Sequence, residues 1–459
     1  MAKLTDFSNE LLLDVVSHLT TSNASDVKAL LHLCRTSRAL CNVALPALYT
    51  SVRIAESQPD PLNRMKLFLR TIIECPSLAR ETEELALTND RGVRYEWPGL
   101  QHDAAFMELS ALIGRNQGEI EPELCYCPLA AFVLARLPKL QHLHFTAQIE
   151  QPRALLRHMH EMEADSGCLG SLKSFFFHKQ YEDGPVDISD YIPLIRYPSF
   201  AEFSTRSDIS DTPCGSSATN TLTPSSAELL WCMGPSSKMH QLLNACSLLT
   251  RFKLIIPDWR RYRHMSDVAH HPLVTPRALT IALLETHRKT LETLYLDFHH
   301  YYDLSDPELR EEIEDAGYRF DESYCTYPSF RAFERLAHLT IEFEKLVHVR
   351  HLPDSLRSLN LQSCRFGDLD GGVLRNLVRL KETWCPALES VTLGGWEETN
   401  ESVAAVRECL RALGVLVRVS LDGRVLMLLG VGFEVRISSR ESVLSDASAC
   451  GEEEEMLAV

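Results

Sequence analysis

Apolar residues near the start of the chain recur at the spacing of an amphipathic helix. On a helical wheel of the segment ELLLDVVSHL, residues 10–19, one face of about 140° holds Leu11, Leu12, Val15, Val16 and Leu19. Leu13 lies beyond the edge of this face. The pattern predicts a helix and leaves two alternatives open, because Leu13 either packs on another part of this chain or contacts a partner protein.

Helix signals continue through the first fifty residues. Ser8 is the predicted N-cap of the first helix, and the cap-type residues of TTSNASD interrupt the helical pattern. Apolar residues at helical spacing resume in residues 27–45. Pro46 predicts the end of that helical segment, because proline has no backbone N–H to donate. The β-branched residues that follow, in residues 49–54, predict a first strand.

A short leucine-rich phrase, LxxLxL, then returns along most of the chain. Six copies are clear, at residues 137–145, 167–177, 287–298, 333–343, 352–364 and 385–395, and two weaker copies lie at 76–88 and 246–256. The L-x-L side chains share one face of a short strand, and the leucine three positions earlier turns inward, so each copy needs a neighbour to complete its core. The sequence therefore predicts an α/β protein with an irregular leucine-rich-repeat solenoid and a parallel strand face.

Three segments interrupt or follow the repeats. Residues 205–226 are rich in Ser, Thr and Pro, which predicts a mobile loop. Residues 302–323 hold nine acidic and two basic residues and form an acidic insertion. Residues 436–459 include the run GEEEE and predict a disordered acidic tail. The predicted domains are therefore an all-helical head at 1–50 and a repeat domain at 51–435.

The composition favours a folded protein of the cytoplasm, the nucleus or both. Hydrophobic residues make up 45% of the chain and charged residues 24%, as in globular proteins. The net charge of −17 disfavours binding to nucleic acid, which needs a surplus of cations. No apolar run is long enough to predict a membrane span, and MAKLTDFSNE lacks the apolar core of a secretory signal. The 14 cysteines are scattered and predict reduced thiols.

The sequence contains none of the common motifs of catalysis or nucleotide binding. The patterns GxxxxGK, GxGxxG, HExxH and GxSxG are absent. Histidines cluster at residues 142–144, 158–160, 270–271 and 299–300, but no spaced cysteines or carboxylates accompany them to fix a metal geometry. We therefore expect no enzymatic activity, no cofactor and no metal.

One basic segment is a candidate contact for a target protein. Residues 251–264, RFKLIIPDWRRYRH, hold five basic residues and one acidic residue. The guanidinium groups of Arg260, Arg261 and Arg263 match the paired oxygens of carboxylates or phosphates. Two alternatives stay open: the acidic insertion 302–323 neutralises this segment, or both segments are solvated faces.

Three segments of the head form one pattern: FSNELLLDVVSHL at 7–19, VKALLHLCRTSRAL at 27–40 and NVALPALYTSVRI at 42–54. Together they resemble an F-box, the helical module that binds the small Skp-type adaptor of cullin-based ubiquitin ligases. Phe7 and Ser8 stand where that family usually has Leu-Pro, so a side-chain cap replaces the fixed φ of proline. With a leucine-rich body behind this head, the chain is similar to fungal F-box proteins with irregular leucine-rich repeats.

The resemblance implies a substrate-recognition subunit of an SCF-type ubiquitin ligase. The head would bind a Skp-type adaptor and through it a cullin, and the repeat domain would bind an unidentified target protein. The implied adaptor-binding residues are Phe7, Ser8, Leu11, Leu12, Leu13, Val15, Leu30, Leu31, Leu33 and Cys34. The alternative is a leucine-rich interaction scaffold whose head packs internally and meets no ligase.

Overall fold

The computed structural model describes a little over half of the chain. The described residues are 8–19, 24–54, 61–88, 126–147, 155, 168–179, 199–206, 222–230, 232, 236–256, 274–298, 311, 325–346, 348–364, 380, 384–395, 416–419, 426–429 and 434–439. They fall into two compact units that divide near residue 205.

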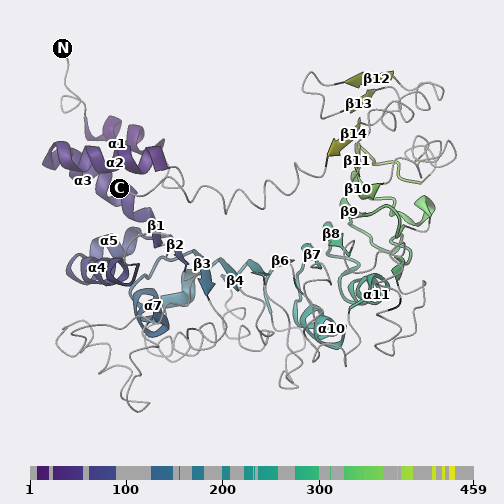
Figure 1. Cartoon of the computed structure of the whole chain (residues 1–459), viewed down its shortest axis with the longest axis horizontal. Helices are drawn as coiled ribbons and strands as arrows, with labels where there is room; N and C mark the ends of the chain where they lie inside the picture. The colour runs from purple at the N-terminus through teal and green to yellow at the C-terminus, as the bar shows by residue number, and fades with distance from the viewer. Residues whose placement is uncertain are drawn as a thin grey trace. The chain divides into compact units, whose positions relative to one another are not determined.

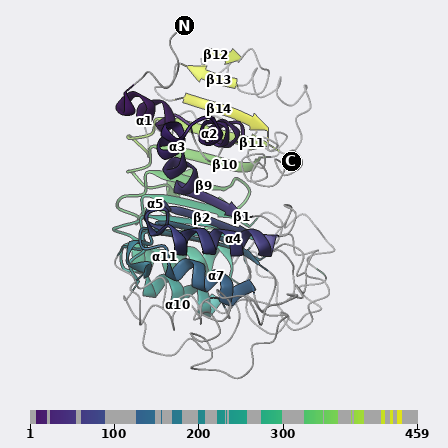
Figure 2. The same ribbon diagram turned by 90° about the vertical axis from the view of Figure 1, so that its left-hand side faces the viewer.

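Three packed helices open the first unit: α1 (Asn9–Ser17), α2 (Ala24–Thr36) and α3 (Arg38–Thr50). In Figures 1 and 2 they lie together at the N-terminal end of the described chain, and both α1 and α2 contact α3. The predicted N-cap is confirmed, because the Ser8 hydroxyl accepts a hydrogen bond from the Leu11 N–H at 3.5 Å. Ser37 separates α2 from α3 and caps α3 through the Leu40 N–H at 3.2 Å.

The prediction that Pro46 ends the second helical segment is wrong. Pro46 lies inside α3, which continues to Thr50 and runs directly into β1 (Ser51–Ile54). A proline inside a helix removes one backbone hydrogen bond and costs about 3 kcal/mol. Packing offsets this cost, because Ala47 and Leu48 lie against the core of the three helices. The predicted first strand is confirmed by β1.

The first unit continues with short parallel strands and the helices between them. The strands after β1 are β2 (Glu84–Thr88), β3 (His142–Ala147), β4 (Ser174–Lys179) and β5 (Glu202–Arg206). The helices are α4 (Pro61–Glu74), α5 (Pro76–Glu81), α7 (Tyr126–Ala135) and the 3-10 turn η4 (Cys168–Ser171). Strands β1 to β4 pair in parallel in the order of the sequence. Helix α3 contacts α5, and α4 contacts both α5 and α7.

The second unit repeats this plan with more strands. Its elements are β6 (Ser226–Leu230), α10 (Ser236–Ala245), β7 (Arg251–Ile255), α11 (Pro276–His287), β8 (Thr293–Asp297), β9 (His338–Glu342), η8 (Val349–His351), β10 (Ser358–Cys364), β11 (Ser390–Gly395), β12 (Leu416–Val419), β13 (Leu426–Leu429) and β14 (Glu434–Ser439). Strands β6 to β11 follow in order and are parallel, β14 pairs in parallel with β11, and β13 and β12 add antiparallel pairs. Helices α10 and α11 lie side by side (Figure 1).

The LxxLxL phrases form the parallel strands, as predicted. The first apolar residue of each strand is in register with its neighbours: Phe252, Leu294, Leu339, Leu359 and Val391. All five side chains are buried. The leucine three positions earlier is buried as well, at Leu249, Leu291, Leu336, Leu356 and Leu388. The α/β fold with a solenoid-like stack of short parallel strands is therefore confirmed.

Backbone hydrogen bonds at the turns repeat with the same period. The Glu292 carbonyl accepts from Ala337 N–H and His338 N–H, each at 2.9 Å, and the Arg357 carbonyl accepts from Glu389 N–H and Ser390 N–H. The same pair of bonds joins the Gln141 carbonyl to the turn before β4. Because these backbone groups pair with the next turn, each repeat depends on its neighbour for hydrogen bonds as well as for apolar contacts.

The predicted loops and tail lie mostly outside the described residues. Thr205 belongs to β5 and Leu222 forms a bridge with Cys246, so both ends of the predicted loop 205–226 are described, whereas 207–221 are not. The acidic insertion 302–323 is outside the description except at Glu311. Strand β14 extends to Ser439, past the predicted start of the tail at 436. Among the described residues, no helix is long and apolar enough to cross a membrane.

Candidate functional site on the helical head

The three helices of the head bury a small apolar core of their own. Its fully buried members are Leu12 and Val16 of α1, Leu30 of α2, and Leu40, Val43 and Ala44 of α3. Leu33 and Cys34 of α2 are half-buried against this core. The face that α1 turns toward its own chain is therefore narrower than the five-residue face of the helical wheel.

The remaining apolar side chains of α1 point to solvent. Leu11, Leu13 and Val15 are 53%, 54% and 51% exposed. At about 100° per residue, Leu11 and Val15 lie on one flank of the buried Leu12 and Val16, and Leu13 lies on the opposite flank. On α2, Leu31 is 38% exposed. We call these four side chains, Leu11, Leu13, Val15 and Leu31, the apolar head surface.

The structure divides the sequence-predicted adaptor residues into three groups. Ser8 and the four residues of the apolar head surface are exposed. Leu12 and Leu30 are buried in the head core, and Leu33 and Cys34 are half-buried beside it. Phe7 lies outside the described residues, as do the predicted target contacts Arg260, Arg261 and Arg263. Residue type alone did not separate the first two groups, because leucine suits a core and an interface equally well.

Charged side chains are exposed on the same two helices as the apolar head surface. Glu10 and Asp14 are exposed on α1, and Lys28 and Arg35 are exposed on α2. Hydrogen bonds from its own backbone N–H and from the Ser8 hydroxyl lower the pKa of Glu10, so this carboxylate stays ionised at the positive end of the helix dipole. At about 100° per residue, Glu10 and Asp14 lie between Leu13 and the pair Leu11 and Val15, so apolar and charged side chains are mixed on the exposed face of α1.

The thiol of Cys34 adds no reactivity to this surface. Burial raises the pKa of Cys34, and the neighbouring Cys41 thiol raises it further. A protonated thiol is a poor nucleophile and a poor metal ligand, so Cys34 acts here as a small apolar side chain. Within the described part of the chain, no three His, Cys, Asp or Glu residues are placed to hold a metal ion.

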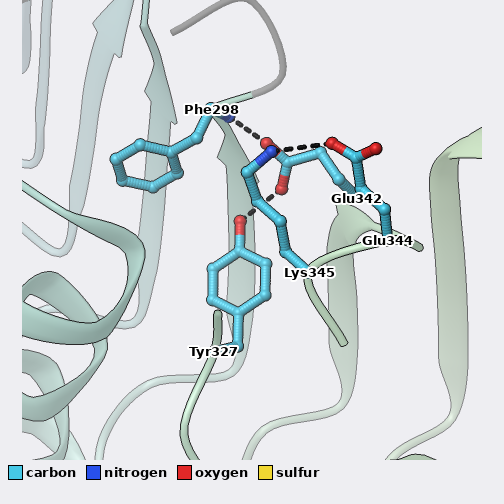
Figure 3. Close-up of polar contacts among 5 residues, drawn as sticks. All are labelled: Phe298, Tyr327, Glu342, Glu344 and Lys345. Atoms are coloured by element: carbon cyan, nitrogen blue, oxygen red, sulfur yellow. Dashed lines mark hydrogen bonds and ion pairs between the residues drawn. The ribbon is translucent and has the colours of Figure 1, made fainter. Parts of the chain in front are cut away.

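A deeply buried polar cluster lies in the described part of the second unit and was missed by sequence reasoning. Glu342 of β9 accepts hydrogen bonds from the Tyr327 hydroxyl and the Phe298 N–H, as Figure 3 shows. The Lys345 ammonium, also fully buried, binds Glu344 at 2.9 Å. Burial raises the pKa of Glu342 to about 7. The Lys345 ammonium acts against this rise, and the Asp297 carboxylate adds to it. The cluster ties the chain at Tyr327 to β9, and the Tyr327, Glu342 and Lys345 side chains are buried, so its role is structural.

Comparison with known proteins does not place the chain in a family. No known protein-family model matches the chain, and no curated protein matches it in sequence. The likeness of the head to an F-box therefore rests on the residues of the head themselves.

Proposed function

We propose that this chain is a substrate-recognition subunit of a cullin-based SCF-type ubiquitin ligase. The apolar head surface binds a Skp-type adaptor, which connects the chain to a cullin. The strand face of the repeat body binds a target protein. Ubiquitin transfer takes place on other subunits, so this chain needs no catalytic residue.

The exposure of three apolar side chains on one short helix carries this proposal. Leu11, Leu13 and Val15 are each more than half exposed, although the same helix buries Leu12 and Val16 completely in its own core. Moving a large aliphatic side chain from water into an apolar contact contributes roughly 1.5–3 kcal/mol. A partner that covers these half-exposed side chains gains part of this free energy, and no described segment of this chain covers them.

The way in which the head joins the repeats supports the same proposal. Helix α3 ends where β1 begins, and the Tyr49 ring stacks on Phe68 of α4 with centroids 6.0 Å apart. The head is thus attached firmly to the repeats through α3, whereas α1 and α2 carry the exposed apolar side chains. The same attachment is the one observation that favours the alternative, a scaffold whose head only caps the first repeat.

Affinity purification followed by mass spectrometry distinguishes the two functions. The full chain should recover adaptor and cullin, and the double variant Leu11→Asp with Val15→Asp should recover neither, since two carboxylates would enter an apolar contact. Leu67→Asp is the matched control, because Leu67 of α4 is an exposed leucine outside the head. Equal recovery by the double variant, with an unchanged melting temperature, would exclude the ligase function.

A further inference from the structure

The solvent face of the second unit's sheet carries a fixed row of side chains. Between the buried residues of neighbouring strands, Lys253 of β7, Tyr295 of β8, Thr340 of β9 and Asn360 of β10 are in register. All four are half-buried, so they line an accessible surface. We call these four residues, together with Gln362 of β10, the Tyr295 strip.

Tyr295 is held in place from two sides. The Lys253 ammonium lies 5.1 Å from the centre of the Tyr295 ring, which is the geometry of a cation–π contact. At its other end, the Tyr295 hydroxyl receives a hydrogen bond from the Gln362 amide nitrogen at 3.0 Å and lies 3.3 Å from the amide oxygen. A tyrosine fixed in this way loses little conformational entropy when a partner binds, which is the property of an interface anchor.

Most side chains around the strip are uncharged. The half-buried or exposed side chains on this face of β8 to β11 are Thr293, Tyr295, His338, Thr340, Ser358, Asn360, Gln362, Ser390 and Thr392. The two carboxylates that share the face, Asp297 and Glu342, are buried. On β7, Lys253 supplies a cation that no described carboxylate binds as an ion pair. Beside Lys253 on this face lie Arg251 of β7, which is exposed, and Glu228 of β6, which is half-buried, so the β7 end of the strip has two cations and one carboxylate and the rest is uncharged.

We propose that the Tyr295 strip binds an extended segment of the target protein that has one carboxylate side chain at its β7 end and uncharged hydroxyl or amide side chains after it. This inference rests on the proposed function, in which the sheet holds the target. Lys253 binds the carboxylate, Tyr295 packs on the segment, and Thr340, Asn360 and Gln362 hydrogen-bond to its polar side chains.

The dimensions and the overall charge restrict the segment further. Neighbouring strands lie about 4.8 Å apart, so β7 to β10 span about 14 Å, which an extended chain crosses in about five residues. A run of acidic residues is disfavoured, because the chain carries a net charge of −17 and Glu228 of β6 is in register with Lys253. Lys253, Arg251 and Glu228 together leave one net positive charge at this end, which a single carboxylate neutralises, because charges interact over about 8 Å at physiological salt.

Fluorescence polarisation with the purified full chain tests this assignment. The probes are labelled pools of eight-residue peptides made of Ser, Thr, Asn, Gln and Gly, with one fixed position occupied by Glu, Lys, Gln or phosphoserine. The variants are Lys253→Glu, Tyr295→Ala and Tyr295→Phe. Lys139→Glu is the matched control, because Lys139 is exposed on a turn of the first unit and makes the same change of charge.

We expect the Glu pool to bind at least tenfold more tightly than the Lys and Gln pools. Lys253→Glu should reverse the preference toward the Lys pool, Tyr295→Ala should abolish binding to every pool, and Tyr295→Phe should weaken binding severalfold. Lys139→Glu should bind as the unchanged chain does. Equal binding of all pools, no binding, or an unaltered preference in Lys253→Glu would overturn the assignment, and tighter binding of phosphoserine would replace the carboxylate with a phosphate.

Melting temperatures of the three variants must stay near that of the unchanged chain for their binding to be compared. If Lys253→Glu melts early, Lys253→Met replaces it, because this change removes the charge and keeps most of the side chain. Binding of a Skp-type adaptor is measured on the same preparations. If the peptides fail to bind while the adaptor binds, the target site assigned to the Tyr295 strip is refuted and the function of the head is not. If the adaptor fails to bind while the peptides bind, the proposed function of the head is refuted.

Discussion

At the scale of single residues, burial separates side chains that the sequence treats as equivalent. Leu11 and Leu12 are adjacent leucines on α1, yet Leu11 is 53% exposed and Leu12 is 4% exposed. The first is available to a partner and the second holds the head together. The same distinction applies on α2, where Leu31 is exposed and Leu30 is buried.

Truncation of Leu12 should therefore affect stability, whereas truncation of Leu11 should affect binding. Leu12→Ala is expected to lower the free energy of unfolding by about 2–5 kcal/mol, because it leaves a cavity in the head core. Leu11→Ala should change stability by no more than about 0.5 kcal/mol and weaken adaptor binding instead. Urea denaturation and calorimetry of both variants measure the two effects. A large loss of stability in Leu11→Ala would show that this side chain packs on its own chain.

Ser8 occupies a position where proline fits the backbone. Its φ of −65° is the value that a proline ring imposes, and its cap to the Leu11 N–H is long, at 3.5 Å. Ser8→Pro should therefore keep adaptor affinity and change stability by less than about 1 kcal/mol. Calorimetric titration with the adaptor checks this, and clearly weaker binding would mean that the Ser8 cap positions the head surface.

Glu342 should make stability depend on pH in a defined direction. Its pKa of about 7 in the folded chain exceeds the ordinary value of 4.5, so the folded state binds more protons than the unfolded state between these values. The stability linked to this proton is complete below about pH 4.5 and is lost as the pH rises through about 7.

Replacing Glu342 with glutamine removes this titration. Because glutamine does not titrate, we expect the difference in unfolding free energy between the Glu342→Gln variant and the unchanged chain to move in the variant's favour as the pH rises from 5 to 8, as followed by urea midpoints. Glu344→Gln is the comparison variant, because Glu344 is more exposed and binds Lys345. Parallel pH profiles for the Glu342→Gln variant and the unchanged chain would contradict this account.

At the scale of elements, apolar spacing predicted most strands but not all of them. Every LxxLxL phrase became a parallel strand, because its spacing matches the geometry of a turn that leads into a strand. Strands β5, β6, β12, β13 and β14 were missed. Of these, β5 uses Phe200 and Phe203 and β6 uses Ala227 and Leu229 in the buried positions that leucine fills elsewhere. The pattern is one of burial, and leucine is only its commonest residue.

Helix α3 offers a test of how packing overrides local propensity. Pro46→Ala restores a backbone N–H inside α3 and should raise the free energy of unfolding by about 1–3 kcal/mol. Chemical denaturation monitored by circular dichroism measures the change. A destabilised variant would show that the proline ring itself packs in the head, beside Ala47 and Leu48.

At the scale of the whole molecule, the sequence predicted the fold class better than the contacts between repeats. The change from packed helices to short parallel strands follows from a change of apolar period from helix to strand, which a single sequence reveals. The Tyr295 strip and the Glu342 cluster could not be predicted, because they join residues from different repeats: Tyr295 and Gln362 are 67 positions apart, and Phe298 and Glu342 are 44 apart. Their contacts depend on the register of the sheet.

Calorimetric titration of the purified full chain with a purified Skp-type adaptor tests the central claim most directly. The account predicts a saturable complex of one adaptor per chain, with a negative change in heat capacity from the burial of Leu11, Leu13, Val15 and Leu31. The double variant Leu11→Asp with Val15→Asp should give no heat of binding while it keeps its circular-dichroism spectrum, and Leu67→Asp should bind normally. An unchanged chain that folds and gives no complex with the adaptor would contradict the account.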